Sequence, residues 1–218
     1  MSDAQERAWA EHSPKYLVDV PRHIASTSVD PQARLDLQAT FGRSAPVTME
    51  IGSGQGHAIV AAATAHPERD FLAVEVYRAG LARTVFNAED AGLTNLRLVE
   101  ANAPEVLDSF LPAGSLDELW IFFPDPWHKK RHTKRRMVKE GFGPSLRRAL
   151  RPGGLVRLAT DWEDYAIQMR EVLDGAPEVE RTFSGDWAPR YEGRVMTAFE
   201  RKGLEKGRVV RDLTYRRV

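Results

Sequence analysis

Residues 50–56 read Glu-Ile-Gly-Ser-Gly-Gln-Gly, and they lie between a short apolar stretch and an alanine-rich one. In α/β sheets a ligand binds beyond the carboxyl ends of the strands, where glycines let the backbone approach it closely. Gly52, Gly54 and Gly56 therefore predict a nucleotide-binding loop, although a tight strand-to-helix turn without a ligand would use the same residues. A dinucleotide fingerprint would need its third glycine at position 57, which is a histidine.

Two further polar residues follow the next two apolar stretches. Glu75 lies 23 residues after Gly52, and Asn102 follows the stretch 96–100. A carboxylate at the first position can accept hydrogen bonds from both ribose hydroxyls, as in NAD enzymes, and an amide oxygen at the second can accept one from adenine. The alternatives are an exposed strand-end carboxylate and an ordinary loop asparagine. The glycine spacing, with an acid at Glu50, resembles the first motif of S-adenosylmethionine methyltransferases.

Asp125 lies between two prolines in the string Phe-Pro-Asp-Pro-Trp, directly after the apolar stretch 116–123. Proline on each side removes backbone freedom, so the carboxylate is held rigidly at a strand end, as a catalytic acid requires. Six Lys or Arg residues follow within 129–136. Clustered bases of this kind neutralise phosphates, although many such runs are only solvated helix faces.

The chain resembles the bacterial tRNA (guanine-N7-)-methyltransferase family over residues 41–203. The matching stretches are MEIGSGQG, FLAVEVY, IFFPDPWHKKRHTKRR, RPGG, ATDWEDYA and GRVMTAFERKG. The string around FPDPW is far more specific than a glycine loop. The resemblance implies an enzyme that transfers a methyl group from S-adenosylmethionine to N7 of a guanine in tRNA.

The resemblance also assigns residues to the cofactor, the substrate nucleoside and RNA. The cofactor residues are Glu50, Gly52, Gly54, Gly56, Glu75, Asn102 and Asp125, of which Asp125 is also catalytic. The residues at the nucleoside are Lys129, Asp161, Thr197, Ala198, Phe199 and Glu200, and those at RNA are Arg131, Lys134, Arg135 and Arg136. The family usually has Asp where this chain has Asn102, and its Arg- and Gly-rich upstream stretch is not evident here.

The chemistry of guanine sets what such a site must do. N7 carries an available lone pair, so it can attack a sulfonium methyl group without first losing a proton, and in-line positioning is the main task. We expect Asp125, with Asp161 or Glu200, to accept hydrogen bonds from guanine N1–H and the 2-amino group. Adenine presents an acceptor at that edge and would be rejected.

Apolar stretches alternate with helical ones along most of the chain. The strands are expected at 47–51, 71–76, 96–100, 116–123 and 155–160, and the helices at 57–67, 77–92, 104–110, 138–150 and 162–175. This alternation predicts a doubly wound α/β fold, Rossmann-like and mostly parallel, with the segment 208–218 as an antiparallel C-terminal edge. Residues 1–40 are expected to be a partly disordered extension with a helix at 31–41, and residues 41–218 the methyltransferase domain.

Composition narrows the function further. The formal net charge is zero, yet residues 127–158 carry +10, residues 194–218 carry +5, and the rest of the chain therefore carries −15. This asymmetry suits one basic face for a polyanion such as tRNA. The absence of cysteine excludes disulfides, thiolate metal sites and a cysteine nucleophile. No stretch approaches a membrane span, so we expect a cytoplasmic protein without a membrane partner, either a monomer or a weak dimer.

Three other functions stay open at this point. One is a methyltransferase that acts on another RNA or another nucleobase position. An NAD-dependent oxidoreductase fits Glu75 but not the glycine spacing, and an RNA-binding protein without catalysis would keep a vestigial loop. A metal at His128 and His132, which have helical i, i+4 spacing, is disfavoured because the bases around them repel a cation.

Overall fold

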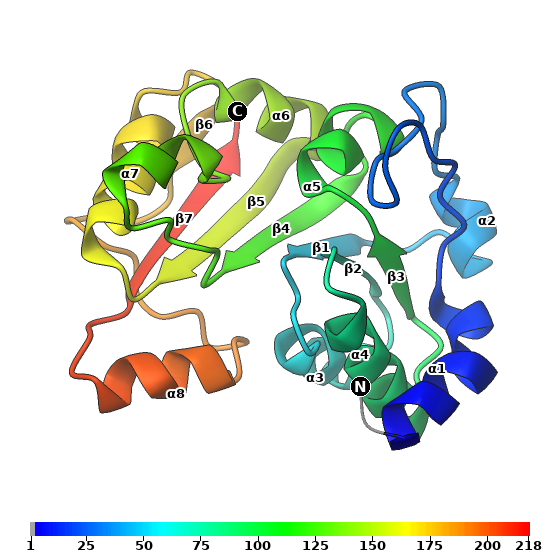
Figure 1. The fold of residues 1–218 in the computed structure, drawn as a ribbon. Coiled ribbons are helices and arrows are strands. Elements are labelled where there is room, and N and C mark those ends of the chain that lie inside the picture. The colour runs from blue at the N-terminus through cyan, green and yellow to red at the C-terminus, as the bar shows by residue number, and fades with distance from the viewer. Residues whose placement is uncertain (1–2) are drawn as a thin grey trace. The chain divides into compact units, whose positions relative to one another are not determined.

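The computed structural model describes residues 3–218 and divides the chain into two compact units, Met1–Pro112 and Ala113–Val218. Each unit is an α/β assembly with its own part of the sheet (Figure 1). We call them the first and the second unit.

The strands of the first unit are all parallel and follow the order β3-β2-β1. Its elements are α1 (Asp3–Tyr16), α2 (Leu37–Phe41), β1 (Val47–Ile51), α3 (His57–Ala65), β2 (Asp70–Glu75), α4 (Arg78–Asp90), β3 (Leu96–Glu100), α5 (Ala103–Glu105) and the π-helical turn η1 (Val106–Phe110). Every residue of β1 is buried, as expected of a parallel strand that is covered on both faces.

The second unit has the strand order β4-β5-β7-β6. Its elements are β4 (Leu116–Phe122), the 3₁₀ turn η2 (Lys130–Arg135), α6 (Phe142–Ala149), β5 (Leu150–Thr160), α7 (Glu163–Asp174), β6 (Val179–Arg181), α8 (Ala198–Glu205) and β7 (Arg211–Arg217). Strand β4 pairs with β5 in parallel, whereas β7 pairs with β5 and β6 in antiparallel orientation. The expected α/β class, with a mostly parallel sheet and an antiparallel C-terminal part, is confirmed.

Local sequence explains most element boundaries. Helix α4 ends at Asp90, and Gly92 after it adopts a φ of 62°, the left-handed conformation in which glycine commonly ends a helix. The expected helix at 31–41 is shorter, because Asp36 caps it by accepting a hydrogen bond of 2.9 Å from the N–H of Ala39. Residues 3–16 form α1, which the sequence analysis did not anticipate.

Helix α1 packs against α4 and has a polar anchor at its end. The hydroxyl of Tyr16, which is fully buried, donates a hydrogen bond of 2.8 Å to Glu89 on α4, and Lys15 makes an ion pair of 2.7 Å with the same carboxylate. Leu17 then forms a parallel bridge with Leu98 of β3. Side chains far along the chain therefore hold α1 in place, which explains why its own sequence has little apolar periodicity.

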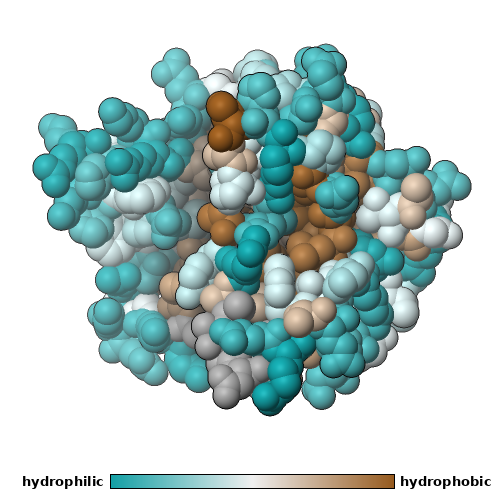
Figure 2. All heavy atoms as spheres, turned by 45° about the vertical axis from the view of Figure 1, so that its right-hand side comes forward, coloured by the Kyte–Doolittle hydropathy of each residue, from teal (hydrophilic) through white to brown (hydrophobic). Residues whose placement is uncertain are grey.

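Hydrophilic side chains cover most of the face shown in Figure 2, with hydrophobic patches between them. The large hydrophobic residues that are most exposed include Ile24, Tyr77, Phe199 and Val209. Within residues 3–218, no helix combines the length and the hydropathy that a membrane crossing requires.

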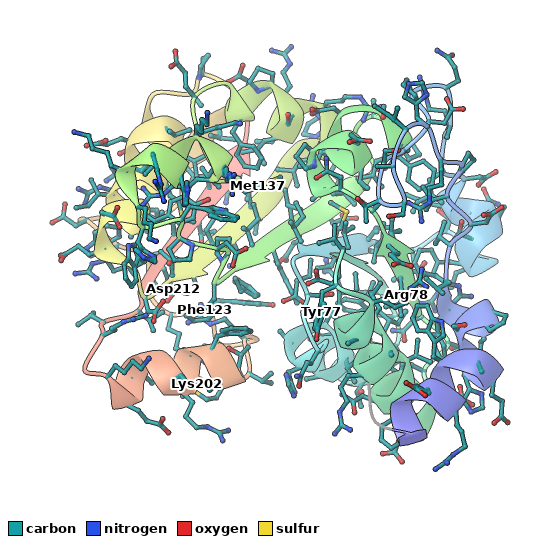
Figure 3. All side chains as sticks on the ribbon, viewed as in Figure 1. Tyr77, Arg78, Phe123, Met137, Lys202 and Asp212 are labelled. Atoms are coloured by element: carbon teal, nitrogen blue, oxygen red, sulfur yellow. The ribbon has the colours of Figure 1, made fainter. Side chains whose placement is uncertain are left out.

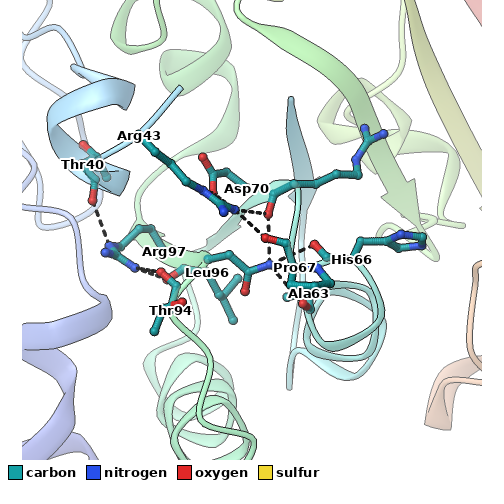
Figure 4. A network of polar contacts seen from close by, with 11 residues as sticks. Thr40, Arg43, Ala63, His66, Pro67, Asp70, Thr94, Leu96 and Arg97 are labelled. Carbon is teal, nitrogen blue, oxygen red and sulfur yellow. Dashed lines mark hydrogen bonds and ion pairs between the residues drawn. The ribbon is translucent and has the colours of Figure 1, made fainter. Parts of the chain in front are cut away.

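Buried polar groups join α3, β2 and β3 in the first unit (Figure 4). The side-chain amide of Asn95 donates to the carbonyl oxygens of Ala63, His66 and Arg69 at 3.0, 3.1 and 3.0 Å. Close by, the guanidinium of Arg43 contacts Asp70 at 2.7 Å, and Asp70 is almost completely buried. These contacts fix the turn that leads into β2, and β2 carries Glu75 at its end.

We predict that Asn95→Ala lowers the free energy of unfolding by about 2 kcal/mol, because buried carbonyl oxygens lose their donor. Urea denaturation followed by circular dichroism measures the loss. The control is Thr94→Ala at the exposed neighbouring position, which should change stability by less than about 0.5 kcal/mol. Equal effects of the two variants would show that the Asn95 amide does not stabilise this turn.

Candidate functional site

The glycine loop lies between β1 and α3, as the sequence predicts. Gly52, Gly54 and Gly56 have φ angles of 69°, 55° and 75°, which side chains with a Cβ rarely adopt. No atom lies within 4 Å of where a Cβ would stand at Gly52 or Gly54, whereas at Gly56 a Cβ would collide with Thr84 of α4. The first two glycines therefore leave open space beside the loop, and the third allows close helix packing.

Glu75, at the end of β2, holds this loop in place. Its Oε2 accepts a hydrogen bond of 2.8 Å from the N–H of Gly54, and its Oε1 accepts two more, from Val76 at 2.7 Å and Tyr77 at 2.9 Å. Figure 3 labels Tyr77 at the start of α4. A carboxylate has about four acceptor positions, so one on Oε2 is left for a ligand hydroxyl.

The carboxyl group of Glu50, near the end of β1, accepts fewer hydrogen bonds than a buried carboxylate requires. The side chain is 4% exposed, and Oε2 has no hydrogen-bond partner among the described residues. A backbone N–H of Ile59 donates to this carboxyl group, yet burial, reinforced by the charge of Glu75, raises the pKa of Glu50 to about 8. Ser53 Oγ in the loop is a second buried atom without a partner in the described chain. Unpaired polar atoms beside open space fit a polar ligand.

Asn102, which follows β3, is the last of the predicted cofactor residues that lie in the first unit. Its Nδ2 donates a hydrogen bond of 2.8 Å to Glu105, and the backbone N–H of Val29 donates to the other oxygen of Glu105 at 2.6 Å. The structure therefore brings Glu50, Glu75 and Asn102 to the carboxyl ends of three neighbouring parallel strands. In this fold class, that edge is the place where nucleotides bind.

Asp125 lies in the second unit, just beyond β4. The segment leaves the strand through an unusual backbone, since Phe123 and Trp127 have φ angles of 51° and 41° although neither is glycine. A backbone hydrogen bond of 2.7 Å from Phe123 to Ala159 of β5 holds the first bend. The Asp125 side chain is exposed. Strain that the surrounding structure maintains is common at functional sites.

The basic segment after Asp125 contains exposed and buried members. Arg131, Lys134 and Arg135 are exposed, and the Arg135 guanidinium lies 5.0 Å from the centre of the Trp127 ring. Arg136, by contrast, is 3% exposed, and its guanidinium group donates hydrogen bonds within the second unit. The acceptors are Asp164 at 2.6 Å, Gln168 at 2.7 Å and the carbonyl of Pro126 at 2.8 Å. Arg136 thus anchors the segment that presents the other bases.

The carboxylates expected at the nucleoside are held by arginines. Asp161 contacts Arg208 at 3.0 Å, and Glu200, 2% exposed, contacts Arg194 at 3.0 Å and Arg190 at 3.2 Å. Burial alone would raise the pKa of Glu200, but hydrogen bonds from the two arginines outweigh it and lower the pKa. Both carboxylates are therefore paired within the second unit.

The segment 197–200, expected to contact the nucleoside, is the start of α8 and not a loop leading to a strand. Thr197 caps the helix by accepting a hydrogen bond of 3.1 Å from the N–H of Glu200. Phe199 is 67% exposed, and Ala198 is the first residue of the helix. Lys129 precedes η2 and is exposed.

Sequence reasoning missed Arg194, which organises this region. Its guanidinium is fully buried and pairs with both Asp212 of β7 and Glu200 of α8. It also lies over the ring of Phe123, 5.5 Å from the ring centre; Figure 3 labels Phe123 and Asp212. The sequence around it gave no signal, because its partner Asp212 falls on the same alternating positions as the polar residues Thr214 and Arg216. Among residues 3–218, no cluster of three His, Asp or Glu side chains is placed to hold a metal ion.

Comparison with known proteins identifies relatives of the chain. A family model described as a putative methyltransferase matches residues 44–213. The tRNA (guanine-N(7)-)-methyltransferase of Cutibacterium acnes is 50% identical and covers 100% of this chain and 80% of its own length. The enzyme of the same name from Paenarthrobacter aurescens is 44% identical and covers 98% of this chain and 87% of its own.

Solved structures show the same fold at low identity. The 16S rRNA methyltransferase KamB matches with a TM-score of 0.60 at 18% identity, over 90% of this chain and 99% of that one. The antibiotic-resistance methyltransferase Kmr matches with a TM-score of 0.56 at 20% identity, over 91% and 99% of the two chains. The expected Rossmann-like methyltransferase fold is confirmed. Because the relatives of 44% and 50% identity align over nearly the whole chain, this protein belongs to the tRNA (guanine-N(7)-)-methyltransferase family.

Proposed function

We propose that this protein transfers the methyl group of S-adenosylmethionine to N7 of a guanine in tRNA. The observation that carries the proposal is the edge formed by β1, β2 and β3, where the glycine loop, Glu50, Glu75 and Asn102 meet. A tRNA substrate would place the reaction in the cytoplasm. The names of the relatives support the same substrate and position.

The residues of the first unit fit the parts of the cofactor. Glu75 keeps an acceptor position for a ribose hydroxyl, and Asn102 offers an amide oxygen to the adenine amino group. Glu50 supplies a buried carboxylate for the cofactor's ammonium group. The bound cofactor supplies a methyl group on a positively charged sulfur. NAD would use Glu75 in the same way but gives no role to the buried, unpaired oxygen of Glu50.

The residues of the second unit position the base. The new bond joins guanine N7 to the methyl carbon while the sulfur–carbon bond breaks, so no proton needs to leave and no general base is required. Asp125, which is exposed and flanked by two prolines, accepts hydrogen bonds from the guanine N1–H and 2-amino groups. The family resemblance also assigns Asp125 to the cofactor. Asp161, Lys129 and the start of α8 are the further groups assigned to the nucleoside.

The test measures transfer of labelled methyl groups from S-adenosylmethionine to unmodified tRNA, followed by identification of 7-methylguanosine. We predict that Asp125→Ala lowers turnover at least about 100-fold, because the base loses its positioning acceptor, while tRNA binding persists. Asp125→Asn should fall between Asp125→Ala and the wild type. The matched control, Asp186→Asn at an exposed ion pair with Arg170, should keep the wild-type rate.

Other outcomes would contradict the proposal. Near-normal turnover of Asp125→Ala would remove this residue from the mechanism. A methyl group at another position of the base would give a different specificity. Stabilisation by NAD but not by S-adenosylhomocysteine would indicate an oxidoreductase, and tRNA binding without transfer would indicate a binding protein.

The raised pKa of Glu50 predicts that cofactor binding is linked to proton release. Below pH 8 the free protein keeps this carboxyl group protonated, whereas the ammonium group of S-adenosylhomocysteine favours the ionised form. Affinity should therefore increase about tenfold per pH unit from pH 6 toward pH 8 and then level off. Calorimetry in two buffers of different ionisation enthalpy measures the released proton. Glu50→Gln should bind without proton release and with little pH dependence, and an equally flat profile for the wild type would contradict this role.

The exposed bases Arg131, Lys134 and Arg135 are proposed to bind tRNA phosphates, with Arg136 anchoring them. Charge reversal of the three should reduce the slope of log K against log salt by about 0.7 to 0.9 for each phosphate that the variant no longer neutralises. A salt titration of tRNA binding measures this slope. The control reverses three exposed arginines outside the two basic segments, Arg7, Arg22 and Arg34, and should keep the wild-type slope. Parallel lines for the wild type and the first variant would contradict the docking role.

A further inference from the structure

The side-chain amide of Asn102 is held in one orientation by its neighbour Glu105. Nδ2 of Asn102 lies 2.8 Å from Oε1 of Glu105, three residues further along the chain. Oε2 of Glu105 accepts a hydrogen bond of 2.6 Å from the backbone N–H of Val29. The backbone of Asn102 is fixed as well, because its N–H donates to the carbonyl of Thr27 at 2.7 Å.

The chemistry of Asn102 and Glu105 allows only one orientation of the Asn102 side-chain amide. The hydrogen bonds from Asn102 and Val29 lower the pKa of Glu105, so its carboxyl group is ionised at neutral pH. A carboxylate only accepts hydrogen bonds, whereas an amide has a donor end and an acceptor end. Nδ2 must therefore face Glu105, and Oδ1 is the atom that Asn102 can offer to a ligand.

We infer that Glu105 is a positioning residue that makes the site select a 6-aminopurine over a 6-oxopurine, by keeping Oδ1 of Asn102 toward the base. This inference rests on the proposed cofactor site and deepens it. The 6-amino group of adenine donates a hydrogen bond, which Oδ1 accepts. A 6-oxo group can only accept, so it would meet Oδ1 as a second acceptor and form no hydrogen bond there.

The same contact explains what the substitution Asn102→Asp would do in this chain. It would place a second carboxylate within hydrogen-bond distance of the ionised Glu105. Like charges at that separation repel, and one group would have to take up a proton or move away. Asn102 and Glu105 therefore form a matched pair, in which an amide at one position suits an ionised acid at the other.

The first experiment measures the affinities of S-adenosylhomocysteine and its deaminated analogue, S-inosylhomocysteine, for the purified full-length protein. In Glu105→Gln, the N–H of Val29 donates its hydrogen bond to the amide oxygen of the glutamine. The glutamine nitrogen then faces Asn102. The Asn102 amide then turns and offers Nδ2 to the ligand. We expect the preference for the adenosyl ligand to fall at least about tenfold, because the analogue gains a donor while the adenosyl ligand loses an acceptor.

The control is Glu100→Gln, which removes an acid two residues before Asn102 that pairs with Arg78 at 3.0 Å. It should keep the wild-type preference. If Glu105 served only to hold the segment around Val29, both ligands would weaken together and their ratio would not change. That result would overturn the inference and leave the cofactor site intact. Failure of the wild-type protein to bind either ligand would instead contradict the proposed function.

A double-mutant cycle tests the pairing independently. Asn102→Asp alone should weaken S-adenosylhomocysteine binding about tenfold or more, because the new carboxylate faces Glu105. Adding Glu105→Gln should restore affinity to within about threefold of the wild type, since the glutamine nitrogen can donate to the aspartate. Equal losses in the single and the double variant would show that the two residues are not coupled.

Discussion

The arrangement of the first unit depends on one carboxylate that accepts three backbone hydrogen bonds. Glu75 holds the N–H of Gly54 and the N–H groups of Val76 and Tyr77, so the glycine loop and the start of α4 share one anchor. Gly80 of α4 makes this possible, because a Cβ there would collide with the carbonyl of Gly54. Charge-assisted hydrogen bonds are roughly twice as strong as neutral ones, so this carboxylate holds the glycine loop firmly against the start of α4.

The second unit uses the opposite arrangement, a buried cation between two acids. Arg194 joins β7 through Asp212 and α8 through Glu200, and it lies over the ring of Phe123, two residues before Asp125. Removing one partner of a buried ion pair leaves an uncompensated charge, which is far more costly than the pair is favourable. Arg194 therefore positions two segments that carry proposed nucleoside contacts, the chain after β4 and the start of α8, against the same strand β7.

These two arrangements explain what could be predicted from the sequence. Strands β1 to β5 were found because each contains a local apolar run, whereas the three-residue β6 was missed. The loop was found because three glycines at fixed spacing mark a backbone that other residues avoid. Helices α1 and α8 were missed, since α1 is anchored by the distant Glu89 and α8 by an arginine, Arg194, whose burial the sequence does not show. For the same reason, Arg136 looked like its exposed neighbours in the sequence although the fold buries it.

The carboxylates of the first unit differ in how many donors surround them, and this difference separates their roles. Glu75 accepts three hydrogen bonds from the loop and the start of α4 and keeps a position for a ribose hydroxyl, whereas Glu105 accepts two, one that orients Asn102 and one that holds Val29. Glu50 has one, from Ile59, and its second oxygen is buried with no partner among the described residues. A buried acid with too few donors keeps its proton until a cation arrives. The buried, unpaired oxygen of Glu50 therefore marks where the positive end of the ligand belongs, while Glu75 holds the glycine loop and Glu105 orients Asn102.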